Sequence, residues 1–186
     1  SSIDDAVKLI NKAKKPFIVW GQGVILGNAE VEFKSFVEKS GIPAAWTILG
    51  VSALPTSHEL NVGMVGMHGN YGPNLLTNEC DLLVAIGMRF DDRVTGDPKT
   101  YANQAKIIHL DIDPAEINKN IKVEVPIIGD CKESLKLITE KIEKRSHEKW
   151  ISKFDDLMKI EFDKVINSDL NPSKKGLTMG AVSYTH

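Results

Sequence analysis

Short apolar segments alternate with amphipathic segments along most of the chain. Residues 17–20, 82–86 and 106–110 are short and almost wholly apolar, and residues 43–48 and 123–128 have a similar character. Apolar runs of this length are typical of strands that are buried on both faces. Such strands, alternating with helices, indicate the α/β class with a doubly wound parallel sheet and helices on both faces. We therefore expect a Rossmann-like sheet of about six strands.

Residues with known capping preferences mark the ends of the expected helices. Ser2 and Asp5 have the spacing of a capping box, which predicts a first helix that Pro16 ends. Apolar positions at helical spacing from residue 29 onward predict a second helix that ends at Gly41. Pro73 suits the first turn of a short helix that runs to about residue 79.

The second half of the chain predicts further helices. Asp113 followed by Pro114 is an N-cap with proline at the first helical position. Residues 135–142 carry the apolar face of a helix that closes the sheet domain. By contrast, the glycine-rich residues 49–69 are expected to form loops.

Beyond residue 145 the pattern changes to one long amphipathic helix. Its apolar stripe is formed by Trp150, Phe154, Leu157, Met158, Phe162 and Val165. We expect this stripe to pack against the sheet domain or a neighbouring domain, and the charged side chains to face solvent. The chain thus divides into a central nucleotide-binding domain (1–145), a helical extension (146–170) and a linker to a further domain (171–186). The absence of an initiator Met and the small, polar last residues lead us to expect a piece of a larger protein.

Composition narrows the range of functions. The 186 residues carry 23 Lys and Arg against 25 Asp and Glu, a formal net charge of −2. This balance gives no reason to expect binding to nucleic acid or to a membrane surface. No apolar run approaches the ~20 residues that span a bilayer, and the first residues do not form a secretory signal. Cys80 and Cys131 are too few and too far apart for a disulfide framework, so we expect buried thiols in a cytoplasmic, reducing environment.

The first candidate site follows the first strand. Gly21 and Gly23, with Gly27 four positions later, would let a phosphate approach the backbone at a helix N-terminus. The spacing is GxGxxxG, however, and Leu26 stands where the common dinucleotide fingerprint has its third glycine. No acidic residue closes the second strand, so an ordinary NAD site is disfavoured. A tight strand-to-helix turn that needs glycine for geometry alone explains the spacing equally well.

Two further candidate sites lie later in the chain. Residues 66–69 (GMHG) open a helix, where Met67 could support an aromatic ring and His68 could donate a hydrogen bond. Residues 87–96 (GMRFDDRVTG) place Arg89 and Arg93 directly after a buried strand. Both guanidinium groups suit phosphate or carboxylate, and the adjacent aspartates could orient them. The alternative is an exposed loop of ion pairs worth about 0–1 kcal/mol.

Acidic residues end the last two strands. Asp111 is placed to accept hydrogen bonds from ribose hydroxyls, whereas Asp113 is better explained as an N-cap. For Asp130, an N-cap role and a ligand role carry equal weight. The chain has no phosphate-loop motif, no GxSxG, no HExxH and no Cys/His cluster with zinc spacing. These residues therefore predict binding of an extended, phosphate-bearing cofactor, with no catalytic residue and no metal site.

Taken together, the motifs at 66–69, 87–96, 109–119 (HLDIDPAEINK) and 129–130 resemble a known family. Their order and spacing are similar to those of the central domain of acetolactate synthase (acetohydroxyacid synthase) large catalytic subunits, over about residues 1–165. The run RFDDRVTG is the most specific part of this resemblance. It implies a Rossmann-like FAD-binding domain set between two domains that bind thiamine diphosphate.

The resemblance also implies which residues bind FAD. Glycines of the first turn would lie by the FAD phosphates. Thr47, Ile48 and residues of the 65–68 loop would line its middle and flavin portions, residues after the 82–86 strand would form the strand-end wall, and residues after the last two strands would hold the adenosine end. The implied cofactor-binding residues are Gly21, Gly23, Thr47, Ile48, Val65, Met67, His68, Gly87, Met88, Arg89, Asp91, Arg93, Val94, Asp111, Ile112, Glu116, Gly129, Asp130 and Cys131. Met67, Asp92 and Arg93 would also border the substrate channel. Gln22, Met88 and Asp111 depart from the residues most frequent in the family, which affects the expected details of FAD binding.

For the parent enzyme, the resemblance implies condensation of two 2-oxo acids, pyruvate with pyruvate or 2-oxobutyrate, in branched-chain amino-acid biosynthesis. Thiamine diphosphate and magnesium would be held by the flanking domains, so this fragment alone would be inactive. The parent would be a homo-oligomer that can associate with a small regulatory subunit. Two alternatives remain at this point: the central domain of another thiamine-diphosphate enzyme, of the glyoxylate carboligase or pyruvate oxidase type, and a stand-alone nucleotide-binding module.

Overall fold

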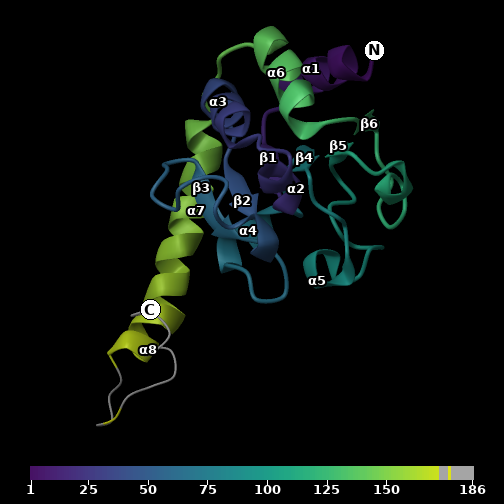
Figure 1. Ribbon diagram of the computed structural model, residues 1–186. Coiled ribbons are helices and arrows are strands. Elements are labelled where there is room, and N and C mark those ends of the chain that lie inside the picture. The colour runs from purple at the N-terminus through teal and green to yellow at the C-terminus, as the bar shows by residue number, and fades with distance from the viewer. Residues whose placement is uncertain (172–175, 177–186) are drawn as a thin grey trace.

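A single parallel sheet organises the chain. The computed structural model describes residues 1–171 and residue 176, with the side chain of Asp169 left out (Figure 1). The sheet has six strands in the order β3-β2-β1-β4-β5-β6, and every neighbouring pair runs parallel. The strands are β1 (Pro16–Trp20), β2 (Ala44–Trp46), β3 (Asn61–Met64), β4 (Leu82–Ile86), β5 (Lys106–Asp111) and β6 (Val125–Ile128). The expected doubly wound fold is confirmed, and the strand order reverses direction between β1 and β4.

Helices cover both faces of this sheet. One face packs against α1 (Ser2–Lys12), α3 (Glu30–Ser40) and α6 (Cys131–Lys141), which lie together at the top of Figure 1. The other face packs against α4 (Tyr71–Leu76) and α7 (Glu148–Glu161). Successive side chains of a strand point to opposite faces, so β1 contributes Ile18 and Trp20 to the first core and Phe17 and Val19 to the second. This explains why β1 reads as continuously apolar.

Helix α7 is anchored to the sheet only through its first half. The Trp150 indole donates to the Pro16 carbonyl at 2.8 Å, and the Phe154 ring lies 5.2 Å from the ring of Phe17. Phe162 and Val165 remain exposed, in the π-helical turn η3 (Phe162–Ile166) that precedes α8 (Asn167–Leu170). The second half of α7 extends away from the body of the domain (Figure 1). The expected packing of the apolar stripe is therefore confirmed only up to Leu157, which is partly buried. The linker expected from residue 171 onward lies almost entirely outside the described residues.

Several element boundaries differ from those that the sequence predicts. The capping box is formed by Ser1 and Asp4, one position earlier than expected. Strand β2 is shorter than predicted, because residues 48–50 form the 3₁₀ turn η1 (Ile48–Gly50). Helix α4 ends at Leu76 instead of residue 79. The C-terminal end of α3 is as predicted, with Gly41 at a φ of +63°.

One strand was not predicted. Strand β3 lies within the stretch expected to be loop, because its four residues include an asparagine and a glycine and offer only two apolar positions, too few for a recognisable strand pattern. It is an edge strand, and its pairing with β2 shifts register between Ala44 and Trp46. Three short helical turns complete the strand ends: α2 (Gln22–Leu26), α5 (Asp92–Thr95) and η2 (Pro114–Glu116). Among the described residues, no helix has the length and apolar character needed to cross a membrane.

Candidate functional site

A cavity of about 610 Å³ runs along the carboxyl edge of the sheet. This volume is in the range of small-molecule and cofactor sites. The carboxyl ends of parallel strands, at the point where the strand order reverses, are where doubly wound sheets bind ligands. The cofactor-binding residues predicted from the sequence that line it are Gly23, Thr47, Ile48, Val65, Met67, His68, Gly87, Met88, Arg89, Asp91, Arg93, Val94, Asp111, Ile112, Gly129, Asp130 and Cys131.

Two predicted cofactor-binding residues and one predicted channel residue do not line the cavity. Gly21 lies behind the wall, and its amide donates to the carbonyl of Ile86 at 3.0 Å. The Glu116 carboxylate pairs with Lys119 at 2.8 Å in the turn that follows β5. Asp92, which was expected to border a substrate channel, is the first residue of α5 and is exposed.

The centre of the cavity floor is a contact between two backbone segments. The Gly23 amide donates to the Gly87 carbonyl at 2.8 Å, and the Gly87 amide donates to the carbonyl of Leu110 at 2.8 Å. A Cβ atom on Gly23 would lie 2.6 Å from the Gly87 Cα, and Gly87 itself has a φ of +56°. Glycine is therefore required here for packing and for backbone conformation. Backbone packing alone therefore explains the glycines at positions 21 and 23. The same packing brings the two loops close to any ligand in the cavity.

The loop after β3 forms one wall and is held by two asparagines. The Asn74 side chain accepts from the Gly66 amide and donates to the Gly66 carbonyl, both at 2.9 Å. The Asn70 side chain accepts from the Met64 amide at 2.9 Å. The Met67 amide donates to the carbonyl of Arg93 at 2.8 Å, which ties this loop to α5. These bonds present Met67, which is 64% exposed, toward the cavity.

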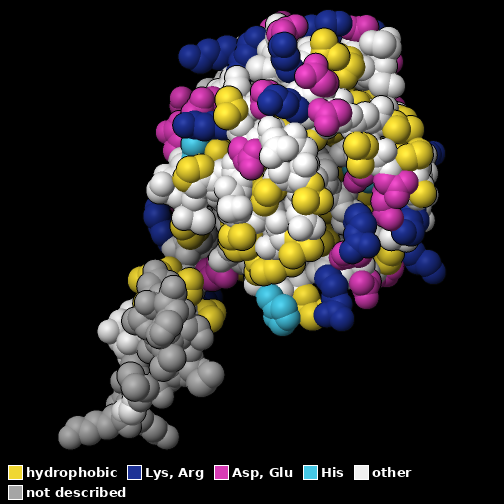
Figure 2. Space-filling model, in the orientation of Figure 1, with side chains coloured by type: hydrophobic (Ala, Val, Ile, Leu, Met, Phe, Trp, Pro, Cys, Tyr) yellow, Lys and Arg dark blue, Asp and Glu magenta, His cyan; other side chains and the backbone are white. Residues whose placement is uncertain are grey.

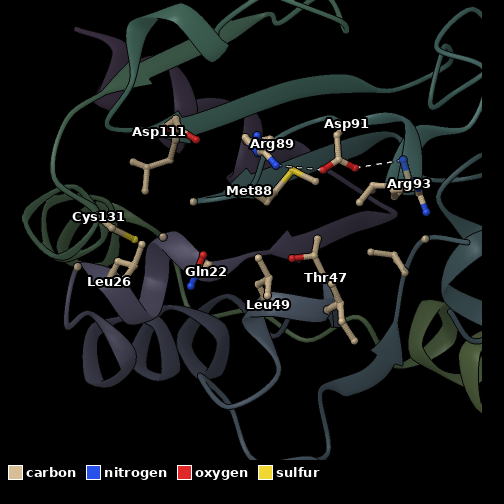
Figure 3. Close-up of a pocket in the computed structure, with 18 of the residues that line it drawn as sticks. Gln22, Leu26, Thr47, Leu49, Met88, Arg89, Asp91, Arg93, Asp111 and Cys131 are labelled. Carbon is tan, nitrogen blue, oxygen red and sulfur yellow. Dashed lines mark hydrogen bonds and ion pairs between the residues drawn. The ribbon is translucent and has the colours of Figure 1, made fainter. Parts of the chain in front are cut away.

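The charged loop after β4 continues this wall. Asp91 caps α5 by accepting from the Arg93 amide at 3.1 Å, and it lies 3.6 Å from the Arg89 guanidinium. Figure 3 shows both interactions as dashed lines, with Gln22, Leu49 and Thr47 on the facing wall. Asp91 thus pairs with the Arg89 guanidinium, whereas it contacts Arg93 through the backbone amide and not through the side chain. The Arg89 side chain is 65% exposed at the cavity and keeps donors available for an anion.

The far end of the cavity is acidic. Asp111 accepts from the Asp113 amide at 2.9 Å, and its other oxygen lies 3.7 Å from the imidazole of His109. Burial by itself would raise the pKa of Asp111, but the hydrogen bonds from His109 and from backbone amides lower it below its ordinary value. Asp130 caps α6 by accepting from the Glu133 amide at 3.0 Å and also lines the cavity. The N-cap and ligand interpretations of Asp130 are therefore compatible.

Cys131 contributes an apolar surface and no reactive group. It lies beside Leu26 at this end of the cavity (Figure 3). Burial, and then the negative charges of Asp130 and Asp111, raise the pKa of the Cys131 thiol to about 12. The thiol therefore stays protonated at neutral pH, and it is a poor nucleophile.

Exposed apolar side chains surround the mouth of the cavity. Leu26, Ile48 and Ile112 are 72%, 68% and 72% exposed, and Leu49 is 58% exposed. In Figure 2 hydrophobic side chains gather on this face of the domain, in the lower half of the view. Apolar surface gathered around a cavity is typical of a ligand site or an interface between domains.

Several cavity residues are not among the predicted cofactor-binding residues. They are Gln22, Leu26, Gly27, Leu49, Met64, Gly66 and Leu110. Gly27 and Gly66 belong to the glycine motifs already described, whereas the leucines and Met64 carry no motif of their own. The available signal was their position, because each lies within a few residues of a strand end. Among the described residues, no group of His, Cys, Asp and Glu side chains is arranged to hold a metal ion. The arrangement can bind an elongated ligand, but it pairs no nucleophile with a base.

Comparison with known proteins gives one consistent result. Residues 3–138 match the family described as the thiamine pyrophosphate enzyme, central domain. The chain is 53% identical to the acetolactate synthase large subunit of Corynebacterium glutamicum over 138 residues, which are 74% of this chain and 22% of that protein. It is 44% identical to a probable acetolactate synthase large subunit of Methanocaldococcus jannaschii over 161 residues, 85% of this chain and 27% of that protein. It is 38% identical to the Buchnera aphidicola large subunit over 179 residues, 92% of this chain and 31% of that protein. The chain thus spans roughly a quarter of the length of these relatives.

Proposed function

Because the chain belongs to the central-domain family of thiamine pyrophosphate enzymes, among the acetolactate synthase large subunits, we propose that its cavity binds FAD. The observation that carries this proposal is the layout of the cavity. It extends along all six strand ends, from Asp111 and Asp130 after β5 and β6, past the Gly23–Gly87 contact and Arg89, to Ile48 and Met67 after β2 and β3. An extended dinucleotide matches this order, with ribose hydroxyls at the acidic end, the diphosphate at the glycine contact and the flavin at the far end.

The residues present fit such a ligand on chemical grounds. The carboxylates of Asp111 and Asp130 can accept from ribose hydroxyls. The contact between Gly23 and Gly87 leaves no side chain between the backbone and a diphosphate. The exposed side chains of Ile48 and Met67 offer a surface for an aromatic ring system. In this proposal FAD is bound by shape and hydrogen bonding, and no residue of this chain is catalytic.

We further propose that the parent enzyme condenses pyruvate with a second 2-oxo acid, in branched-chain amino-acid biosynthesis in the cytoplasm. Thiamine diphosphate, with magnesium, would supply the carbanion chemistry from domains outside this chain. Met67 and Arg93 would then lie where the cavity meets the substrate channel, and Asp92 would lie next to them. The flanking domains of the same polypeptide would cover the apolar rim at Leu26, Ile48 and Ile112, as part of a homo-oligomer with a small regulatory subunit. The isolated fragment would form no acetolactate.

The experiment is a flavin titration of the 186-residue chain and of the full-length parent. We expect FAD fluorescence to be quenched on binding, FMN to bind more weakly, and ADP to compete with FAD for the adenosine end. Leu26→Asp should weaken FAD binding, because it places a charge on the cavity wall. Val31→Asp is the matched control, since Val31 is 79% exposed on α3 and does not line the cavity. Failure of both the chain and the parent to bind FAD would overturn the proposal.

A further inference from the structure

His109 is a fully buried imidazole in β5 whose position the proposed function does not explain. Its side chain is 0% exposed, and its Nε2 lies 2.9 Å from the Met88 carbonyl oxygen. The same nitrogen lies 3.7 Å from Oδ2 of Asp111. The other ring nitrogen, Nδ1, is buried and has no hydrogen-bond partner among the described residues.

The contact with Met88 determines which nitrogen of the neutral ring carries the hydrogen. A carbonyl oxygen only accepts hydrogen bonds, so Nε2 must carry the proton that it shares with Met88. In the neutral ring Nδ1 is then an acceptor without a donor. Leaving a buried acceptor unpaired costs about 1–3 kcal/mol, which an apolar side chain at position 109 would avoid. A buried polar group that is kept at such a cost calls for an explanation.

The two partners of Nε2 both belong to the cavity wall. Met88 follows Gly87 at the end of β4, and Asp111 ends β5, so the imidazole bridges two neighbouring strand ends. Phe90 packs edge-on against the imidazole at a centroid distance of 4.9 Å, which restricts rotation of the ring. Asp111 is also held by the Asp113 amide on its other oxygen. One oxygen of the carboxylate is thus fixed by a hydrogen bond, and the other faces the imidazole at 3.7 Å, while the residue lines the cavity.

We propose that His109 is a positioning residue for ligand binding. Its Nε2–H holds the Met88 carbonyl by a hydrogen bond and lies close to the Asp111 carboxylate, where the N–H dipole favours the ionised form, so that Asp111 is ready to accept from a ligand hydroxyl. The inference rests on the proposed function in one respect, namely that the ligand carries ribose-like hydroxyls. It adds a role for a residue that does not itself line the cavity.

Two substitutions of His109 test the role. Gln places an amide donor near the position of Nε2, so His109→Gln should keep FAD affinity within about threefold of the unsubstituted chain. Met removes both ring nitrogens, and His109→Met should weaken FAD binding by about tenfold or more, as expected for loss of a preorganised polar contact. Unfolding in urea should change much less than binding, because Met also removes the unpaired Nδ1. His147→Met is the control, since His147 is a second buried histidine that does not line the cavity.

A second measurement does not depend on flavin. The carboxyl ¹³C signal of Asp111 is titrated by NMR in the unsubstituted chain and in the three variants. We expect the pKa of Asp111 to rise in His109→Met and to stay low in His109→Gln and His147→Met.

The two measurements separate the possible failures. If neither the unsubstituted chain nor the full-length parent binds FAD, the proposed function fails, and the Asp111 titration still decides the role of His109. An unchanged Asp111 titration in His109→Met overturns the role. The positioning role is also overturned if His109→Gln and His109→Met weaken FAD binding equally. It is overturned as well if His109→Met loses no more binding free energy for FAD than unfolding free energy in urea.

Discussion

Two regions of one short segment face the same cavity and are held in different ways. At Gly87 the chain touches Gly23 backbone to backbone, with no room for a Cβ atom on either side. A few residues further on, Arg89 is largely exposed and is held only by an ion pair with Asp91 at 3.6 Å. The first region is defined by the absence of side-chain atoms, and the second by side chains that have few contacts within the chain.

The contrast between these two regions distinguishes residues whose backbone must pack closely from residues whose side chains are free to bind a ligand. Where backbones pack closely, any added atom must displace the main chain, because protein interiors are close-packed. Where a charged side chain is exposed, its ion pair contributes little to stability. We therefore expect substitutions at the glycine contact to act on folding and substitutions in the charged loop to act on ligand binding. The four predictions below test this contrast from the largest expected effect to the smallest.

Gly87→Ala should lower the free energy of unfolding by about 3 kcal/mol or more, since it combines overpacking with a left-handed backbone. Its Cβ would lie 2.7 Å from the Gly23 Cα, at a φ of +56°. Gly96→Ala is the matched control, because Gly96 has a φ of +58° and nothing within 4 Å of the added Cβ. It should cost about 1–3 kcal/mol, the backbone contribution alone, because the Gly96 φ of +58° and ψ of −122° disfavour any residue with a Cβ atom. Urea unfolding measures the stability of both variants. Equal losses of unfolding free energy would show that the contact with Gly23 is unimportant.

Asp91→Ala should cost about 1 kcal/mol, the usual effect of losing an N-cap side chain. The bond lost is the one that the Asp91 carboxylate accepts from the Arg93 amide at 3.1 Å. Asp91→Asn keeps an acceptor in the same place and should retain most of the stability in urea unfolding. If the two variants are equally destabilised, then the charge pairing with Arg89 matters and the cap does not.

The stability of the chain should fall on acidification in part through Asp111. Its pKa is lowered in the folded state, so its contribution is present above the pKa of the unfolded chain and is lost as the pH falls through the folded pKa. The decline should begin below about pH 4. Asp111→Asn should flatten this part of the curve when urea midpoints are compared between pH 6 and pH 3. An identical pH dependence in the variant would contradict the assignment.

Arg89→Gln should leave the free energy of unfolding unchanged within about 0.5 kcal/mol, because the ion pair that it removes is exposed. The same substitution should weaken binding of FAD several-fold, since a donor group is lost from the cavity wall. Lys153→Gln is the control, as it removes an exposed ion pair with Glu79 at 2.9 Å away from the cavity. The contrast would fail if Arg89→Gln destabilised the chain and left FAD binding intact.

The parts of the fold that local chemistry dictates could be predicted from the sequence. Strand β4 has the predicted bounds because it is wholly apolar and buried on both faces. The caps at Asp113 and Gly41 are where their residue types indicated. Strand β3 could not be predicted, because it is stabilised by pairing with β2 and its two apolar positions are too few to indicate a strand.

The candidate site was predicted unevenly for a similar reason. The charged and glycine-rich motifs pointed to the correct edge of the sheet, because strand ends are visible in a hydrophobic pattern. Leu26 and Leu49 line the cavity without any motif, and exposed leucines are common on protein surfaces. Glu116 belongs to a motif and yet turns away from the cavity to pair with Lys119.

By itself, the sequence determined the class of the fold, the places where helices and strands begin and end within a few residues, and the edge of the sheet that carries polar residues. These properties depend on local periodicity, capping and apolar content, which neighbouring residues in the sequence set by themselves. Only the tertiary structure decided that Gly23 and Gly87 touch, that two asparagines hold the Met67 loop, and that His109 bridges Met88 and Asp111. Those contacts join residues far apart in the sequence, and distances of a few tenths of an ångström determine whether each one forms.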